Sequence, residues 1–206
     1  MYGDLLEVGR TLLCLVLAGA TIKLMDDYLD AEYDICRGKH TLAVKLSRGT
    51  LPYALVLGLL AAYLNLDITI SVFFGSYAAG MLTTWREKLP TRVPAFIEII
   101  VAFGLSTLLV GWHIALWGAC LMAMFDWLDD LVDRMTDHKT GQRNMALRIG
   151  VVETTLLTLI VMCAAILLNA WWTALGFIAL TMLTMLSEAT TSTLWQALDE
   201  DNGVHL

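Results

Sequence analysis

Apolar residues form long runs along this chain, and polar and charged residues are concentrated between the runs. The length and apolar content of the runs predict helices. At about 20 residues per membrane crossing plus loops, the chain has room for about six or seven spans. The predicted segments lie at about 4–29, 51–65, 67–85, 93–110, 112–130, 151–168 and 171–188. The predicted fold class is all-α, a polytopic membrane bundle of about seven transmembrane helices.

The composition agrees with a membrane protein. The 206 residues are 58% hydrophobic and 16% charged, with a mean hydropathy of +0.68. Soluble domains average about 45–50% apolar and about 25% charged residues. Membrane lipids are therefore expected partners, and the net charge of −7 argues against nucleic acid. The four cysteines are scattered without CxxC spacing, so they are interpreted as small apolar residues and not as metal ligands.

The basic residues predict an orientation. Eleven of the 13 Lys and Arg residues fall in the connections after the first, third and fifth segments, and the alternate connections contain none. In membrane proteins, cytoplasmic loops have such an excess of Lys and Arg. We expect a multi-pass protein of the cell membrane, with its N-terminus outside and its C-terminus and active site cytoplasmic. Residues 1–190 are predicted to form a single transmembrane domain, followed by a polar cytoplasmic tail at 191–206. No cleavable signal peptide is expected.

Two acidic runs close apolar segments and repeat each other. Residues 26–34 read DDYLDAEYD and residues 126–133 read DWLDDLVD. An offset of 99 aligns three aspartates of the first run with Asp126, Asp129 and Asp133. The repeat halves would span about 4–92 and 93–190, in parallel orientation, so both acidic runs would face the cytoplasm. Binding sites in membrane proteins often lie between such repeats.

The aspartate spacing predicts a carboxylate stripe on each helix, because residues three, four and seven apart share a face. Each stripe is predicted to lie at a helix C-terminus, where the macrodipole disfavours anions, so a counter-charge is needed. Two or three Mg²⁺ ions would supply it and hold a diphosphate. The expected metal ligands are Asp26, Asp27, Asp30, Asp34, Asp126, Asp129 and Asp133. The alternative interpretation is a solvated acidic face at the membrane boundary.

Substrate roles follow from the same arrangement. Lys and Arg in the basic loops would bind the outer phosphate oxygens; we expect these to be Lys39, Lys45, Arg143 and Arg148. A polyprenyl diphosphate fits, since its chain would enter the apolar bundle while bound metal stabilises the departing pyrophosphate. The expected catalytic aspartates are Asp27, Asp30, Asp126 and Asp129. Glu98 and Trp127 are further candidate site residues. The favoured interpretation of Glu98 is a partner for Arg92 or a surface acid, and that of Trp127 is a packing or interface residue.

These motifs resemble the UbiA superfamily of intramembrane prenyltransferases. That family has an N-D-x-x-D-x-x-x-D motif and a later D-x-x-x-D motif, and here Asp26 takes the usual Asn place. The runs GKHTLAVKL and GQRNMALRIG are similar to its basic loops. The resemblance implies transfer of a prenyl group to an aromatic or lipid acceptor. Family members usually have nine helices, so the first and last are expected to be missing from this short, divergent chain.

Other functions remain open on the sequence. The same site would suit a terpene cyclase or a prenyl diphosphatase, which need no acceptor. A non-catalytic membrane protein that binds prenyl diphosphate or divalent cations is a rival from another class. The donor chain length, the acceptor and the formation of a homo-oligomer are likewise open.

Overall fold

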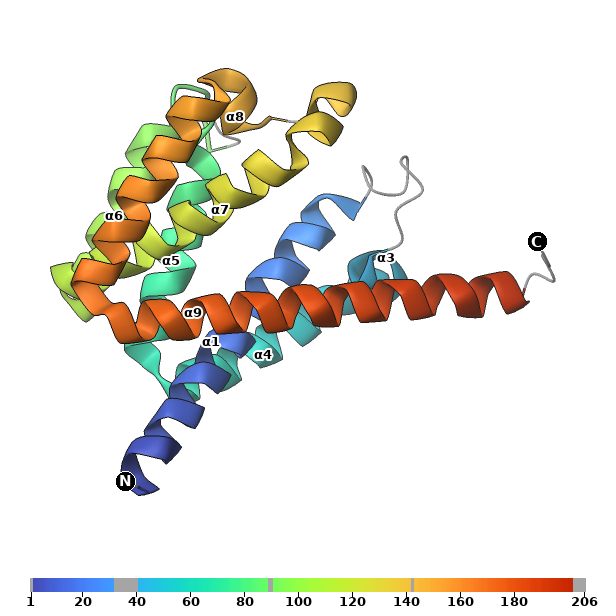
Figure 1. Ribbon diagram of the computed structural model, residues 1–206, viewed down its shortest axis with the longest axis horizontal. Coiled ribbons are helices and arrows are strands. Elements are labelled where there is room, and N and C mark those ends of the chain that lie inside the picture. The colour runs from blue at the N-terminus through green and yellow to red at the C-terminus, as the bar shows by residue number, and fades with distance from the viewer. Residues whose placement is uncertain (1, 32–40, 89–90, 142, 202–206) are drawn as a thin grey trace. The chain divides into compact units, whose positions relative to one another are not determined.

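The computed structural model describes residues 2–31, 41–88, 91–141 and 143–201 (Figure 1). Within these ranges the regular structure is helical, which confirms the all-α prediction. The elements are α1 (Tyr2–Leu29), α3 (Leu42–Leu46), the 3₁₀ turn η1 (Ser47–Gly49), α4 (Thr50–Leu64), α5 (Leu66–Leu82), α6 (Ala95–Val110), α7 (Trp112–Thr140), α8 (Met145–Arg148) and α9 (Val151–Asp201). The first four predicted segments correspond to α1, α4, α5 and α6, with bounds that agree to within a few residues.

The predicted end of the fifth segment at residue 130 is wrong. Helix α7 continues to Thr140, where Gly141 adopts a left-handed conformation with φ 72° and donates its N–H to the carbonyl of Asp137 at 2.8 Å. Glycine terminates helices in this way because it has no Cβ to clash. Hydropathy ends the segment early because the last turns are polar, although polar residues propagate a helix outside lipid as well as apolar ones do.

The last two predicted segments lie on one long element, α9, which breaks at Asn169 with φ −158° and ψ 91°. The Asn169 side-chain oxygen accepts the N–H of Trp172 at 2.9 Å, as an N-cap does for a new helix. The hydroxyl of Thr173 bridges the break, donating to the carbonyls of Ala165 at 3.0 Å and Asn169 at 2.7 Å. A helix break therefore lies where the connection near 168–172 is predicted, and a membrane crossing on either side of it stays a prediction.

Two helical stretches among the described residues are long and apolar enough to cross a membrane, Leu5–Leu29 and Val151–Thr190. Leu66–Leu82 and Ala95–Val110 are apolar but shorter. These stretches give weak support to membrane association. The seven-span topology and its orientation stay predictions.

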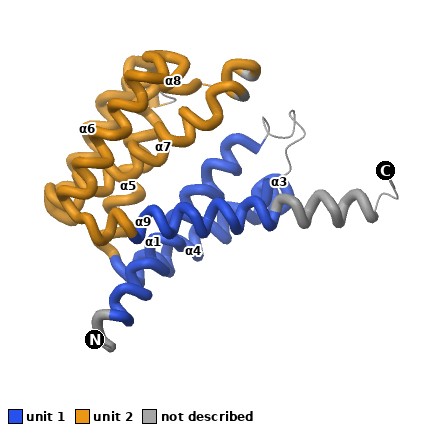
Figure 2. The backbone as a smooth tube through the Cα atoms, viewed as in Figure 1, with its two compact units in different colours: residues 1–65, 175–206 blue, residues 66–174 orange. Residues whose placement is uncertain are grey.

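The chain divides into two compact units, residues 1–65 with 175–206 and residues 66–174 (Figure 2). In the first unit, α1 packs on α4 through small buried residues. Thr21 donates its hydroxyl to the carbonyl of Ala54 at 3.3 Å, and the thiol of Cys14 lies 3.4 Å from the carbonyl of Ala61. Small side chains let helix backbones approach closely, as is common between membrane helices.

In the second unit, α5 and α7 approach each other closely. A Cβ added to Gly75 would lie 2.6 Å from the carbonyl oxygen of Gly118, so glycine is required for this approach. Further along α7, Trp117 is buried and donates its indole N–H to Thr173 of α9 at 3.0 Å. Glu98 of α6 accepts hydrogen bonds from Tyr77 of α5 and from Thr91, so it joins α5 to α6.

Candidate functional site

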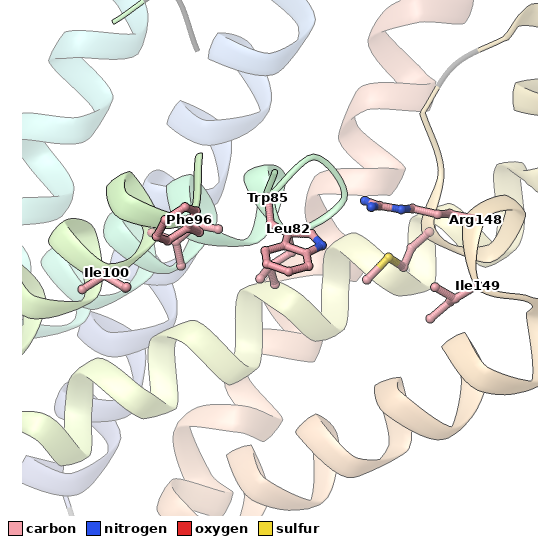
Figure 3. Close-up of a pocket in the computed structure, with 8 residues that line it drawn as sticks. Leu82, Trp85, Phe96, Ile100, Arg148 and Ile149 are labelled. Atoms are coloured by element: carbon pink, nitrogen blue, oxygen red, sulfur yellow. The ribbon is translucent and has the colours of Figure 1, made fainter. Parts of the chain in front are cut away.

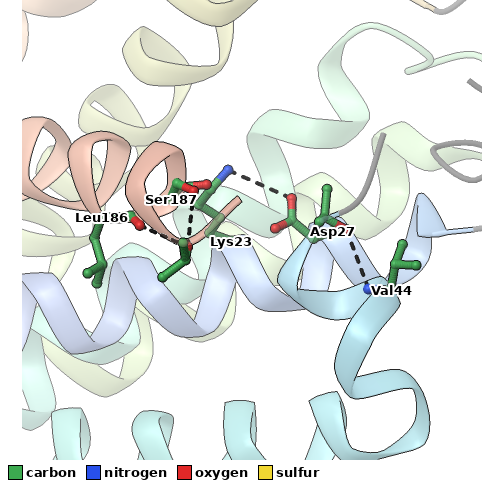
Figure 4. Close-up of polar contacts among 7 residues, drawn as sticks. Lys23, Asp27, Val44, Leu186 and Ser187 are labelled. Carbon is green, nitrogen blue, oxygen red and sulfur yellow. Dashed lines mark hydrogen bonds and ion pairs between the residues drawn. The ribbon is translucent and has the colours of Figure 1, made fainter. Parts of the chain in front are cut away.

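The first aspartate set lies at the end of α1. Asp30 still donates its backbone N–H to the carbonyl of Asp26 at 3.0 Å, so Asp26, Asp27 and Asp30 share the last helical turn. Asp26 and Asp30 are exposed, whereas Asp27 is half-buried. The ammonium of Lys23 lies 3.7 Å from the Asp27 carboxylate (Figure 4). Lys23 thus supplies part of the counter-charge that the acidic helix end needs. Asp34 and Lys39 lie outside the described residues.

Lys45 belongs to the same unit as these aspartates. It lies in the last turn of the short helix α3, and its side chain is exposed. Thr41 caps α3, because its hydroxyl oxygen accepts the N–H of Val44 at 3.5 Å (Figure 4). Thr50 donates its hydroxyl to the carbonyl of Ala43 at 3.2 Å and so ties α3 to the start of α4. These bonds hold the backbone that presents Lys45 to solvent.

The second aspartate set lies along α7 and not at its C-terminus. Asp126, Asp129 and Asp133 occupy about two turns, and α7 continues for about two turns beyond Asp133. The helix dipole acts mainly on the last turn. The unfavourable interaction between the dipole and the carboxylates that the sequence predicts therefore does not apply to this set. Asp129 is exposed, and Asp126 and Asp133 are half-buried. Their neighbour Trp127 is buried against Ala79 and Ala123, which confirms that it is a packing residue.

Two further aspartates of α7 anchor the second basic loop. The carboxylate of Asp130 accepts the N–H of Met145 at 2.7 Å. The amide nitrogen of Asn144 donates to the carbonyl of Asp130 at 2.6 Å and to the carboxylate of Asp137 at 2.9 Å. The Asn144 side-chain oxygen accepts the N–H of Leu147 at 3.1 Å and caps α8. The sequence reasoning missed this role of Asp137 and Asn144, although an Asn before a short helix is an N-cap signal.

The two basic residues of that loop have different surroundings. Arg143 forms an ion pair of 2.6 Å with Glu87, which follows α5, and both side chains are largely exposed. Arg148 lies in the last turn of α8. Because Asp130 and Asn144 fix the start of α8 on α7, they also determine where Arg148 is presented. The substrate roles of both arginines stay predictions.

Carboxylates are the type of ligand that Mg²⁺ binds. Mg²⁺ prefers oxygen ligands, keeps several waters and is usually held by one or two carboxylates together with substrate phosphates. Across the described part of the chain, the structure brings no group of three or more His, Cys, Asp or Glu side chains into a metal-binding cluster. The expected ligand set is untested.

An apolar groove of about 470 Å³ lies beside the second basic loop, between α5, α6 and α8 (Figure 3). We refer to it as the α5–α6–α8 groove; it is lined by Leu82, Trp85, Phe96, Ile99, Ile100, Met145, Arg148 and Ile149. The carbonyl of Trp85 accepts the N–H of Phe96 at 2.9 Å, and a bridge between Lys88 and Pro94 closes the connection after α5. The backbone thus sets the two aromatic residues side by side.

Comparison with known proteins adds no relative. No family model, curated protein or solved structure matches the chain. The similarity to the UbiA superfamily therefore rests on the motif residues described above.

Proposed function

We propose that this protein is a Mg²⁺-dependent intramembrane prenyltransferase, which moves a polyprenyl group from its diphosphate to an aromatic or lipid acceptor. The face of α7 is the observation that supports this best. Asp126, Asp129 and Asp133 lie within two turns, and the loop that contains Arg143 and Arg148 is fixed to the same stretch of helix by Asp130. Acidic and basic groups adjacent in one unit suit a metal-bound diphosphate.

Each residue has a defined task in the proposed reaction. Aspartates of the two sets would hold Mg²⁺, and the ion would supply electrostatic stabilisation to the departing pyrophosphate. Lys45 and Arg143 contact the outer phosphate oxygens. The C–O bond of the donor breaks, and pyrophosphate leaves with the electron pair. The allylic carbon then bonds to the acceptor nucleophile, which releases a proton to water.

We further propose that the seven apolar segments cross the cell membrane and that the site faces the cytoplasm. Support comes from the basic residues, eleven of which follow the first, third and fifth segments, and from the two stretches that are long enough to span. Diphosphate bound at the water boundary then leaves its prenyl chain in the apolar phase.

The purified full chain, mixed with geranylgeranyl or farnesyl diphosphate, Mg²⁺ and extracted membrane lipids, tests the reaction. We expect pyrophosphate release with a prenylated product, identified by mass spectrometry. Asp129→Asn should reduce the rate by about 10- to 100-fold, as lost metal affinity does. Asp67→Asn, an exposed aspartate of α5 outside both sets, is the matched control and should retain activity.

The remaining outcomes distinguish the rivals. Release of pyrophosphate with only a hydrocarbon or an alcohol as the other product would indicate cyclisation or hydrolysis and not prenyl transfer. Tight binding without release would indicate a carrier. Equal rates for Asp129→Asn and Asp67→Asn would refute the site. Asp30→Asn combined with Asp129→Asn should lose less than the product of the two single losses, since both sets are proposed to act on one substrate.

A further inference from the structure

One charged side chain lies in the otherwise apolar α5–α6–α8 groove. Seven of its eight lining residues are hydrophobic, and Arg148 is the charged one. Arg148 and Ile149 lie at the opposite end of the groove from Phe96 and Ile100 (Figure 3). Phe96 is 42% exposed and Ile100 is 66% exposed, so the apolar end is open. The volume of about 470 Å³ lies in the usual range for ligand pockets. An elongated amphiphile with an anionic end fits this arrangement.

The lining residues also indicate which kind of anion the groove would bind. Among the described residues that line the groove there is no carboxylate. A diphosphate bound through Mg²⁺ needs carboxylate ligands, which are on α7. A phosphodiester has a single negative charge and needs no metal, and one guanidinium matches it with two parallel hydrogen bonds. The groove chemistry therefore favours a phospholipid headgroup over a prenyl diphosphate.

The surroundings of the groove are basic and aromatic. The guanidinium of Arg86 lies 4.4 Å from the ring centroid of Trp85, so this lining residue has a cation stacked on it. Residues 83–94 contain three basic groups and residues 141–149 contain two, of which Arg143 is paired with Glu87. Glu98 of α6 accepts a hydrogen bond from Thr91 in the first of these stretches. Tryptophan is enriched at the membrane–water boundary, and basic pockets between membrane helices bind anionic lipid headgroups.

We propose that the α5–α6–α8 groove binds an anionic membrane phospholipid. One acyl chain lies along Phe96, Ile99 and Ile100, and Arg148 holds the phosphodiester. This site goes beyond the proposed enzyme activity and requires neither metal nor turnover. It also gives Arg148 an anion other than the diphosphate expected from its place in the basic loop, so the two assignments can be separated by experiment.

Native mass spectrometry of the purified full chain tests the proposal. Dioleoyl phosphatidylglycerol and dioleoyl phosphatidylcholine are titrated separately from detergent. We expect one phosphatidylglycerol to bind about 5- to 10-fold more tightly than phosphatidylcholine, as one well-placed cation provides. Arg148→Gln should remove this preference. Arg48→Gln is the matched control, because Arg48 is also exposed and in the last turn of a short helix but lies outside the groove.

Further outcomes decide between ligands. Ile100→Glu places a carboxylate at the open apolar end and should weaken binding of both lipids. Equal binding of the two lipids by the natural chain, or an unchanged preference in Arg148→Gln, would overturn the proposal. Displacement of phosphatidylglycerol by geranylgeranyl diphosphate without Mg²⁺ would assign the groove to the substrate instead. Loss of turnover in Asp129→Asn with intact phosphatidylglycerol preference would support the lipid site independently of the enzyme.

Discussion

Asn144 connects three parts of the second unit through one side chain. Its amide nitrogen donates to Asp130 and Asp137 of α7, and its oxygen accepts the N–H of Leu147 at the start of α8. Asn144 and Asp137 are both buried, so a lost partner is not replaced freely by water. An unsatisfied buried polar group costs about 1–3 kcal/mol.

Asn144→Ala should therefore lower the free energy of unfolding by about 1–3 kcal/mol, since it removes both donors and the cap. Thermal unfolding of the detergent-solubilised chain measures this. Asn144→Asp separates the two roles, because Asp caps a helix as well as Asn does but donates no hydrogen bond and adds a charge beside Asp137. We expect Asp at this position to destabilise at least as much as Ala. If Asn144→Asp has the same thermal unfolding midpoint as the natural chain, the role of Asn144 is limited to capping α8.

The aspartates of α7 show what residue spacing can and cannot predict. The spacing of Asp126, Asp129 and Asp133 correctly placed them on one stretch of helix. It could not show that Asp130 accepts a backbone N–H from the next loop, because a carboxylate that caps a helix and one that awaits a metal have the same sequence signature. Roles of this kind depend on contacts between segments, which spacing within one helix does not specify.

At the scale of the helix, the contact between α5 and α7 depends on the absence of side chains. A Cβ at Gly118 would collide with the backbone carbonyl of Ser71, which cannot move unless α5 moves. Gly118→Ala should lower stability by about 1–3 kcal/mol through this overpacking. Thermal midpoints in detergent compare it with Gly80→Ala, which places a methyl group in open space on α5.

The control should be neutral or stabilising, because alanine favours a helix over glycine by about 0.5–1 kcal/mol. Equal midpoints for Gly118→Ala and Gly80→Ala would contradict the close contact that the structure gives to α5 and α7.

Helix positions were predictable because each apolar segment is bounded by polar residues. The four early segments and the break at Asn169 agree with the structure for this reason. The end of α7 was not predictable from hydropathy. Its last turns are polar, and they end at Gly141, whose left-handed conformation and bond to Asp137 are local backbone features. Hydropathy measures where lipid can surround a helix, and hydrogen bonds decide where the helix stops.

At the scale of the whole molecule, the orientation predicted from the basic connections decides whether the two acidic runs face the same compartment. If the segments alternate across a membrane as the basic residues indicate, the connections after α5 and after α7 share a side with the ends of α1 and α9. The break at Asn169 then lies on the opposite side. Under this alternation both acidic runs meet the same aqueous compartment, which a shared diphosphate requires.

Cysteine labelling tests the alternation directly. Single cysteines replace Lys88, after α5, and Ala170, after the break in α9, in a chain without Cys14, Cys36, Cys120 and Cys163. Both positions are exposed, so each accepts a membrane-impermeant maleimide wherever it faces water. In sealed vesicles with the cytoplasmic face inward, we expect Ala170→Cys to react at once and Lys88→Cys only after detergent is added. Immediate labelling of both would put the two connections on one side, because an even number of crossings would then separate them, and the proposed alternation of the segments after α5 would be wrong.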